Sequence, residues 1–290
     1  MANEVKIKIV SKLIPERSDN SHKGTFGKIL NIAGSTKYSG AALLSSISAL
    51  KIGAGYVTLG CIEEIINRIA SQSPEITFLP LKSTQDGTIS KVNEIPNIQE
   101  FDVVSIGCGL TTNEETMDFT KEFLKKINNR QKLIIDADGI NILANFKDGT
   151  HLKNTIITPH PKELSRLLNV SVAEIIDNRK KYARITSQTF ECITVLKGHN
   201  TIITDGEKIY QNTTGNSALA KAGSGDVLTG IIAGLLAQKM DLLEASLLGT
   251  FIHGLSGDIA SKDLTKYSVL ATDIIKYIPQ ALKEIIKAGT

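Results

Sequence analysis

Residues 216–230 read NSALAKAGSGDVLTG. The glycines Gly223 and Gly225 lie just before an apolar stretch begins. Apolar residues follow them with the spacing of one helix face, namely Val227, Leu228, Ile231, Ile232, Leu235 and Leu236. Because glycine lacks a Cβ atom and tolerates sharp bends, the pattern predicts a turn that opens a helix. The first amides of a helix have no intrahelical partner and lie at the positive end of its dipole. Residues 223–227 are therefore predicted to form an anion cradle.

Asp226 is unusual in such a cradle because its carboxylate would meet a ligand that is itself negatively charged. It could accept a proton from a hydroxyl group while the neighbouring amides stabilise a phosphoryl group being transferred to that oxygen. The alternative is a structural role, since Ser224 and Asp226 are both favoured in the first turn of a helix. The Gly-Ser-Gly-Asp motif alone leaves both interpretations open.

The composition suits one α/β domain over residues 1–290, with a core at about 23–288 and an N-terminal arm at 1–22. In 290 residues, 41% are apolar, which is enough for a substantial core. The 33 basic and 30 acidic residues are interspersed and give a net charge of only +3, so a nucleic-acid partner is not expected. Aromatic residues are few and Trp is absent, which also disfavours a base-stacking surface.

The cysteines and the N-terminus favour a cytoplasmic protein without a membrane partner. Cys61, Cys108 and Cys192 are isolated in apolar segments, so disulfides and cysteine-rich metal sites are not expected. No apolar run suits a signal peptide or approaches the roughly 18 residues needed to span a bilayer.

Apolar strand-like runs alternate with helical patterns along the chain, which predicts βαβ units in an α/β fold. Strands are expected at 29–33, 56–59, 102–106, 132–135, 155–157, 193–196 and 202–206. Helices are expected at 39–52, 63–71, 113–127, 162–168, 172–189, 227–236, 242–261 and 273–287. The first 27 residues resemble an arm or loop, so the fold is expected to begin near residue 28. Neither a dinucleotide-binding fingerprint nor a Walker-type phosphate loop occurs.

Several candidate ligand contacts follow predicted strands, at the edge of an α/β sheet where ligands bind. Gly109 lies in a Gly-Cys-Gly-Leu segment that could also be a simple strand-end turn. Asp136 and Asp138 could hold a hydrated Mg²⁺ or cap the next helix, and capping is the commoner use. Near the first strand, Ala41 would let a ligand approach the backbone closely, or would serve only helix packing.

His160 and residues 197–201 are further candidates. Pro159 and Pro161 fix the backbone on both sides of His160, which favours a ligand contact over a structural role. The segment Lys197, Gly198, His199, Asn200 and Thr201 follows a strand and offers an ammonium, a hydroxyl and backbone amides to a phosphate. A hairpin turn is the alternative. Later in the chain, His253 and Asp258 are expected to serve packing or a polar network.

Seven segments together resemble one protein family. They are Lys23–Lys28, Ala33–Ser35 with Tyr38–Ala42, Gly107–Leu110, Asp136–Asn141, Thr158–Glu163, Lys197–Thr201 and Asn216–Asp226. In this order they resemble the ADP/ATP-dependent NAD(P)H-hydrate dehydratases of the ribokinase-like superfamily, over about residues 23–275. Cys108 departs from the family pattern, which usually has Pro between the two glycines. The resemblance implies a three-layer α/β/α sandwich with a mostly parallel central sheet.

The resemblance also implies an activity, the repair of nicotinamide cofactors hydrated at C6, called NADHX and NADPHX. Phosphorylation of the hydroxyl by ADP or ATP with Mg²⁺ would precede elimination of phosphate, giving NADH or NADPH. Asp226 would be the base, with Gly223, Ser224 and Gly225 holding the phosphoryl group. Residues 197–201 and Gly225 would bind the nucleotide. Ala41, Gly109, His160 and Asp226 would contact the hydrate, and the metal ligands cannot be read from the sequence.

Some expectations concern donors, partners and rival functions. ADP is the favoured donor, with ATP possible, and a homo-oligomer such as a tetramer is implied by the family. About 27 residues precede the dehydratase part, so an NAD(P)HX epimerase is expected on a separate chain. Another kinase of the superfamily, for a vitamin precursor or a sugar, is the alternative enzyme. A non-catalytic nucleotide-binding protein is the alternative from a different class.

Overall fold

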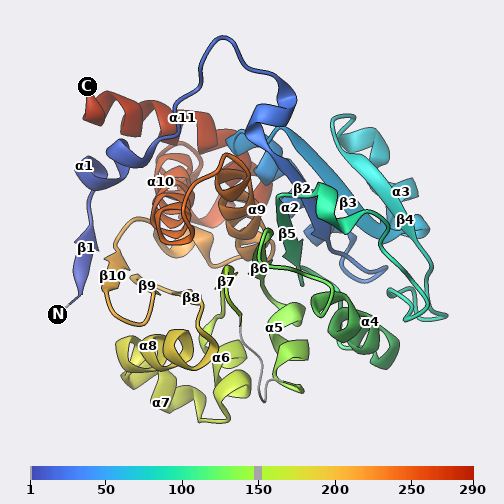
Figure 1. The fold of residues 1–290 in the computed structure, drawn as a ribbon. Helices are drawn as coiled ribbons and strands as arrows, with labels where there is room; N and C mark the ends of the chain where they lie inside the picture. Colours follow the sequence, from blue (N-terminus) through green and yellow to red (C-terminus); the bar gives the residue numbers. More distant parts are fainter. Residues whose placement is uncertain (1, 147–151) are drawn as a thin grey trace.

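The computed structural model describes residues 2–146 and 152–290 and shows one sheet between two layers of helices (Figure 1). The strands of the described residues are β1 Asn3–Val5, β2 Lys28–Ile32, β3 Tyr56–Ile62, β4 Thr77–Leu81, β5 Val103–Ile106, β6 Lys132–Ile135, β7 Thr155–Ile157, β8 Ile193–Leu196, β9 Thr201–Thr204 and β10 Ile209–Asn212. They lie in the order β1-β10-β9-β8-β7-β6-β5-β2-β3-β4. From β8 to β4 all neighbours are parallel, whereas β9 is antiparallel to β8 and β10.

The helices cover both faces of this sheet. They are α1 Ile7–Val10, α2 Ser39–Ile52, α3 Glu63–Ile69, α4 Glu114–Leu124, α5 Asp138–Leu143, α6 Pro161–Leu168, α7 Val172–Asp177, α8 Arg179–Phe190, α9 Ser224–Ala237, α10 Leu242–Ser268 and α11 Ala271–Gly289. Short 3₁₀ turns lie at Ser11–Leu13, Lys23–Phe26, Ala70–Gln72, Ile98–Glu100 and Ser217–Leu219. In Figure 1, α9, α10 and α11 lie on one side of the strands and α4 to α8 on the other. No helix of the described residues is long and apolar enough to cross a membrane.

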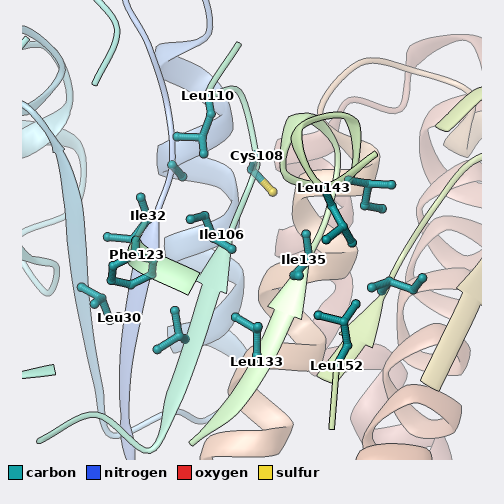
Figure 2. Close-up of a cluster of buried hydrophobic side chains, with 14 of the residues drawn as sticks. Leu30, Ile32, Ile106, Cys108, Leu110, Phe123, Leu133, Ile135, Leu143 and Leu152 are labelled. Atoms are coloured by element: carbon teal, nitrogen blue, oxygen red, sulfur yellow. The ribbon is translucent and has the colours of Figure 1, made fainter. Parts of the chain in front are cut away.

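The central strands are continuous apolar runs because both of their faces are buried. In β6, Leu133 and Ile135 contribute to one hydrophobic cluster and Ile134 to the other, as alternation along a strand requires. Figure 2 shows the first cluster, which includes Ile106 from β5 and Phe123 from α4. Burial of the central strands from both sides fixes the sheet and thereby the loops that follow its strands.

The helix α9 packs very closely against α2. A Cβ atom placed on Gly230 would lie only 2.1 Å from the carbonyl oxygen of Ser45, and one on Gly234 only 2.6 Å from that of Ala49. Glycine at these two positions therefore allows the two helix backbones to approach. This contact sets the position of the N-terminus of α9, where the anion cradle lies.

Several expectations about the elements are wrong. Strands β1, β4 and β10 were not expected, and β1 pairs with β10 in parallel, so the fold already includes the first residues of the chain. The buried side chains of Val5 and Val10 join the core there. The single helix expected over 172–189 is two helices, α7 and α8, divided at Asn178, whose backbone is not helical (φ −129°, ψ 41°). Most other elements lie within a few residues of their predicted bounds.

Candidate active site

The glycine turn and the helix start that the sequence predicts for the anion cradle are present. Gly223 caps α9 with φ 87°, a left-handed conformation that favours glycine, and Ser224 is the first residue of the helix. A Cβ atom on Gly223 would lie 2.6 Å from Leu44 Cδ1 and 3.0 Å from Ala271 Cβ. Both conformation and packing therefore require glycine. The Ser224 amide donates to the Lys221 carbonyl oxygen at 3.3 Å, while no backbone acceptor is found among the described residues for the amides of Gly225 and Asp226, which could meet an anion.

A cavity of about 680 Å³ lies beside the cradle, a volume typical of small-molecule sites. Its lining includes the predicted residues His160, Lys197, Gly198, His199, Asn200, Thr201, Ser224 and Gly225. The segment from Thr214 to Ala222 and the α10 residues Thr250, His253 and Gly254 complete much of the wall. Segments far apart in the sequence thus meet at one hollow, at the ends of β7 and β8 and the start of α9.

A buried ion pair lies under the cradle. The Lys197 ammonium contacts Asp136, whose other carboxylate oxygen accepts a hydrogen bond of 2.6 Å from Thr229. Burial alone would raise the pKa of Asp136, but the Lys197 charge and these hydrogen bonds outweigh burial and lower it. Burial alone would likewise lower the pKa of Lys197, but Asp136 and Glu163 raise it above its usual range. Both groups are therefore charged at neutral pH.

His160 is held rigidly at the start of α6. Its Nδ1 accepts hydrogen bonds from the backbone amides of Lys162 and Glu163, at 3.1 and 3.2 Å. The Glu163 carboxylate in turn accepts a 2.7 Å bond from the His160 amide and lies 3.2 Å from Nε2. Burial and the Lys197 charge lower the pKa of His160, so its ring is neutral with the proton on Nε2. His160 therefore caps a helix and also lines the cavity.

Glu163 completes this network, with one carboxylate oxygen 3.7 Å from the Lys197 ammonium. Burial raises the pKa of Glu163 to about 7, although Lys197 opposes the shift. Lys197 therefore has two carboxylate neighbours, and Asp136 is the nearer of them.

Asp226 makes no ion pair within 4.0 Å among the described residues, although the more distant charge of Lys197 acts to lower its pKa. Its oxygen lies within 4.8 Å of both Cys108 Sγ and an Asp136 oxygen. Burial, and secondly the negative charge of Asp136, raise the pKa of Asp226 to about 6. Among the hydrogen bonds of the described residues, Asp226 accepts none from a backbone amide, so the capping alternative lacks support. The carboxylate can take up a proton near neutral pH, as a general base must.

Ala41 and Gly109 lie together at the loop after β5, where Gly109 follows Cys108. Gly109 has φ 68°, and a Cβ atom there would lie 2.9 Å from Ala41 Cβ and 2.7 Å from Tyr38 Cβ. Neither residue lines the cavity described above. Asp226 does not line the cavity either. It follows Gly225, which does, and its carboxylate lies within 4.8 Å of Cys108 Sγ, beside the smaller group.

Other candidates have structural partners. Asp138 accepts a 2.8 Å bond from the Thr111 amide and a 3.2 Å bond from Asn141, which fits a role in loop and helix structure. Asp258 accepts bonds from the Gly215 amide and the Asn216 side chain, at 2.8 and 2.7 Å. Asp258 thus belongs to a polar network, as expected, and it holds the cavity wall.

The donor set can be tested against Mg²⁺. Cys108, Asp136 and Asp226 form a compact group of potential ligands, but a thiol is a poor partner for this hard cation. Asp136 is already engaged by Lys197 and Thr229. The residues fit a Mg²⁺ ion held mainly by nucleotide phosphates and water, with the carboxylates of Asp226 and Asp136 nearby, better than a cage built of protein ligands.

The sequence interpretation understated three residues. For Asp136 the sequence favours helix capping over a role in ligand binding, and it indicates no role for Glu163 or Thr229. A possible signal was the presence of an Asp, a Lys and a Glu after three predicted strands, at 136, 197 and 163, since parallel strands end at one edge of a sheet. Thr229 gives no comparable signal, because a Thr in an apolar helix has many uses.

Comparisons with known proteins show the family of this chain. A family model described as NAD(P)H-hydrate dehydratase matches residues 29–280. A bifunctional NAD(P)H-hydrate repair enzyme of Dictyoglomus turgidum is 38% identical over 276 residues, covering 93% of this chain and 53% of that protein. An ADP-dependent (S)-NAD(P)H-hydrate dehydratase of Neisseria meningitidis is 35% identical, covering 84% of this chain and 80% of that protein. The chain thus spans about half the length of the bifunctional relatives that it matches.

Solved structures show the same architecture. The ADP/ATP-dependent NAD(P)H-hydrate dehydratase of Bacillus subtilis, co-crystallised with ATP and Mg²⁺, is 30% identical with a TM-score of 0.86, covering 98% of this chain and 99% of that one. The expected ribokinase-like fold with a mostly parallel sheet is confirmed. On the match of the family model and these relatives, the chain belongs to the NAD(P)H-hydrate dehydratase family.

Proposed function

We propose that this protein removes water from NADHX and NADPHX, in their S forms, and returns NADH and NADPH at the expense of ADP or ATP. The observation that carries the proposal is Asp226, a carboxylate whose pKa is raised to about 6 and which lies in the first turn of α9, beside the cradle. The named activities of the relatives support the same reaction. ADP is our preferred donor because the Neisseria relative is ADP-dependent.

The chemistry requires that the hydroxyl be activated, because hydroxide is a poor leaving group. Asp226 accepts the proton of the C6 hydroxyl, and the oxygen attacks the terminal phosphorus of the nucleotide. The bond from phosphorus to the nucleotide breaks, so ADP leaves as AMP, or ATP as ADP. The lone pair of the ring nitrogen then expels phosphate from C6, and loss of a proton from C5 completes the dihydropyridine.

The chain supports the phosphoryl group from two sides. The amides of the N-cap Gly223 and of the first-turn residues Ser224 and Gly225 would hold its oxygens. The Ser224 amide would exchange its 3.3 Å bond to the Lys221 carbonyl for one to a phosphoryl oxygen. The Lys197 ammonium lies 3.8 Å from where a Cβ atom on Gly225 would be, so its charge faces the cradle. Mg²⁺, when bound with the nucleotide, supplies further neutralisation of phosphate charge.

The two residue groups around Asp226 suit two ligands. Residues 197–201 and Gly225 would bind the nucleotide in the cavity, while Ala41 and Gly109 would contact the hydrate near Cys108. His160, for which a hydrate contact is predicted, lines the cavity with residues 197–201, whereas Ala41 and Gly109 do not, so the hydrate would have to extend into the cavity to touch it. These roles are our proposal.

Partners follow from the reaction. The sequence suggested an epimerase on a separate chain. Relatives named bifunctional carry two functions on one chain, so the epimerase need not be separate. A cytoplasmic location and a homo-oligomer also remain predictions. Light scattering on the purified protein measures the oligomeric state directly.

The decisive test is absorbance at 340 nm after the protein, Mg²⁺ and either ADP or ATP are added to purified NADHX, with inorganic phosphate measured in parallel. We expect a nucleotide-dependent rise with one phosphate released for each NADH formed, and the rates with the two nucleotides identify the donor. No rise with either nucleotide would refute the repair function. A screen of hydroxylated small molecules for phosphorylation would then be the next step.

A further inference from the structure

Helix α10 brings an imidazole to the anion cradle. The His253 side chain is buried, lines the cavity, and places Nε2 3.0 Å from the backbone oxygen of Ser224 and 3.1 Å from its hydroxyl oxygen. A carbonyl oxygen can only accept a hydrogen bond, so Nε2 must carry the ring proton. The two Ser224 oxygens share that proton, and the Ser224 hydroxyl accepts.

The other protonation states fit less well. With the proton on Nδ1, the lone pair of Nε2 would face the carbonyl oxygen at 3.0 Å, which is repulsive. A doubly protonated ring is disfavoured because burial lowers the pKa of His253 to about 4. At neutral pH the ring therefore carries one proton, on Nε2.

The Ser224 hydroxyl then has its own proton to donate. Among residues 2–146 and 152–290, His253 is the only hydrogen-bond partner found for the Ser224 hydroxyl. Ser224 lines the cavity as the first residue of α9, at the positive end of the helix. An anion in the cradle is thus a natural acceptor for that proton.

We propose that His253 is a positioning residue for phosphoryl transfer, which holds Ser224 Oγ as an acceptor and so directs the Ser224 hydroxyl proton at the phosphoryl group in the cradle. This inference rests on the proposed function and assigns a specific donor within it. His253 itself does not touch the reacting atoms. Its effect passes through Ser224.

Packing holds the imidazole in place. A Cβ atom on Gly254 would lie 2.2 Å from Thr214 Oγ1, and one on Gly257 would lie 2.5 Å from Leu219 Cδ2. Helix α10 therefore touches the segment that leads to the cradle along one glycine-lined face. Such close packing restricts movement of His253 relative to Ser224, as a directed hydrogen bond requires.

The experiment compares H253Q with H253M. Gln retains an amide donor at the approximate reach of Nε2, whereas Met has similar size and no donor. We expect H253M to lower kcat by about 10-fold to 100-fold, the loss typical of one hydrogen bond to a charged group, with KM for NADHX unchanged. H253Q should recover most of that loss. In an S224A background, H253M should cause no further decrease, because the donor is already absent.

A matched control and a binding readout separate the possible outcomes. Ser256 lies one turn along α10, is buried, and donates to Ile252 within the helix, so S256A should retain kcat. Calorimetry of ADP and AMP binding measures how much the terminal phosphate of ADP contributes, and H253M should reduce the ADP-to-AMP affinity ratio. Equal losses in H253Q and H253M, or additive losses with S224A, would overturn the inference. If the wild-type protein converts no hydrate, the proposed function fails, and an unchanged affinity ratio in H253M would then overturn this inference separately.

Discussion

Asp136 and Asp226 share one buried region, yet their pKa values are shifted in opposite directions. Lys197 and Thr229 stabilise the charge of Asp136, so its pKa is lowered. Asp226 has burial and the charge of Asp136 against it, so its pKa rises to about 6. Two carboxylates with separated pKa values are suited to separate tasks. Asp136 holds the lysine, and Asp226 is available to exchange a proton.

The first prediction concerns Asp226→Asn. Turnover should fall by about three orders of magnitude or more, because an amide cannot accept the hydroxyl proton, while nucleotide binding is retained. In the wild-type protein, kcat/KM should fall as the pH drops below about 6, since the base is active only when ionised. Stopped-flow absorbance and calorimetry measure the two effects. Turnover that is unchanged in the variant would exclude Asp226 as the base.

The second prediction concerns Lys197→Met, which leaves Asp136 and Glu163 without their cation. Removing one member of a buried pair should lower the free energy of unfolding by about 3–5 kcal/mol. The double variant D136N/K197M should be more stable than K197M, because the nearer unpaired carboxylate is gone. Urea denaturation at pH 7 measures all of these proteins. If D136N has no effect in the K197M background, the ion pair does not contribute in this way.

At the scale of elements, the contact between α2 and α9 sets the cradle. The third prediction is that Gly230→Ala lowers the free energy of unfolding by about 1–3 kcal/mol, since its Cβ would meet the Ser45 carbonyl at 2.1 Å. Gly40→Ala is the matched control in α2. Gly40 is exposed with no atom within 4 Å of its added Cβ, so stability should change by less than about 1 kcal/mol. Thermal and urea unfolding compare the two, and equal losses would argue against the packing explanation.

The elements that could be predicted from sequence share a strong pattern. Buried central strands show a continuous apolar run, because both of their faces are covered. Long helices show apolar residues at helical spacing, because one face is covered. β1 and β10 are short and lie at one edge of the sheet, and β4 includes Pro80 at the other edge. Edge strands need less apolar surface, and Pro lowers the strand signal. Their pairing depends on neighbours that lie far away in the sequence.

Some candidate site residues can likewise be recognised from local sequence, and others only from the folded chain. Asp226, His160 and residues 197–201 carry local signals, namely glycine turns, prolines and strand ends. Asp136 and Glu163 become informative only when Lys197 is placed between them, which is a property of the folded chain. Local patterns thus indicate candidate loops, and the fold determines which charges meet.

At the scale of the whole molecule, the N-terminal segment is part of the fold. The fourth prediction is that Val10→Ala lowers the free energy of unfolding by about 1–3 kcal/mol, because Val10 is fully buried among α10 and α11. Ile9 is the control, since its side chain is 44% exposed, and Ile9→Ala should cost about 0.5 kcal/mol or less. Urea denaturation distinguishes them. Equal stabilities of V10A and the wild type would mean that the arm does not support the core.

The arrangement of Lys197, Asp136 and Thr229 also has a consequence for how fast the protein is degraded when a ligand is present. Lys197 is 61 residues from Asp136, and Thr229 is 93 residues from it, so no short fragment carries the complete arrangement. If nucleotide binds at these residues, as proposed, it binds only the completed fold and stabilises that fold by RT ln(1 + [L]/Kd). A protease that cleaves transiently unfolded chains will degrade this protein more slowly as nucleotide concentration rises. On the proposed function, the supply of the phosphoryl donor would affect how long each copy of the protein survives, in addition to how fast it works.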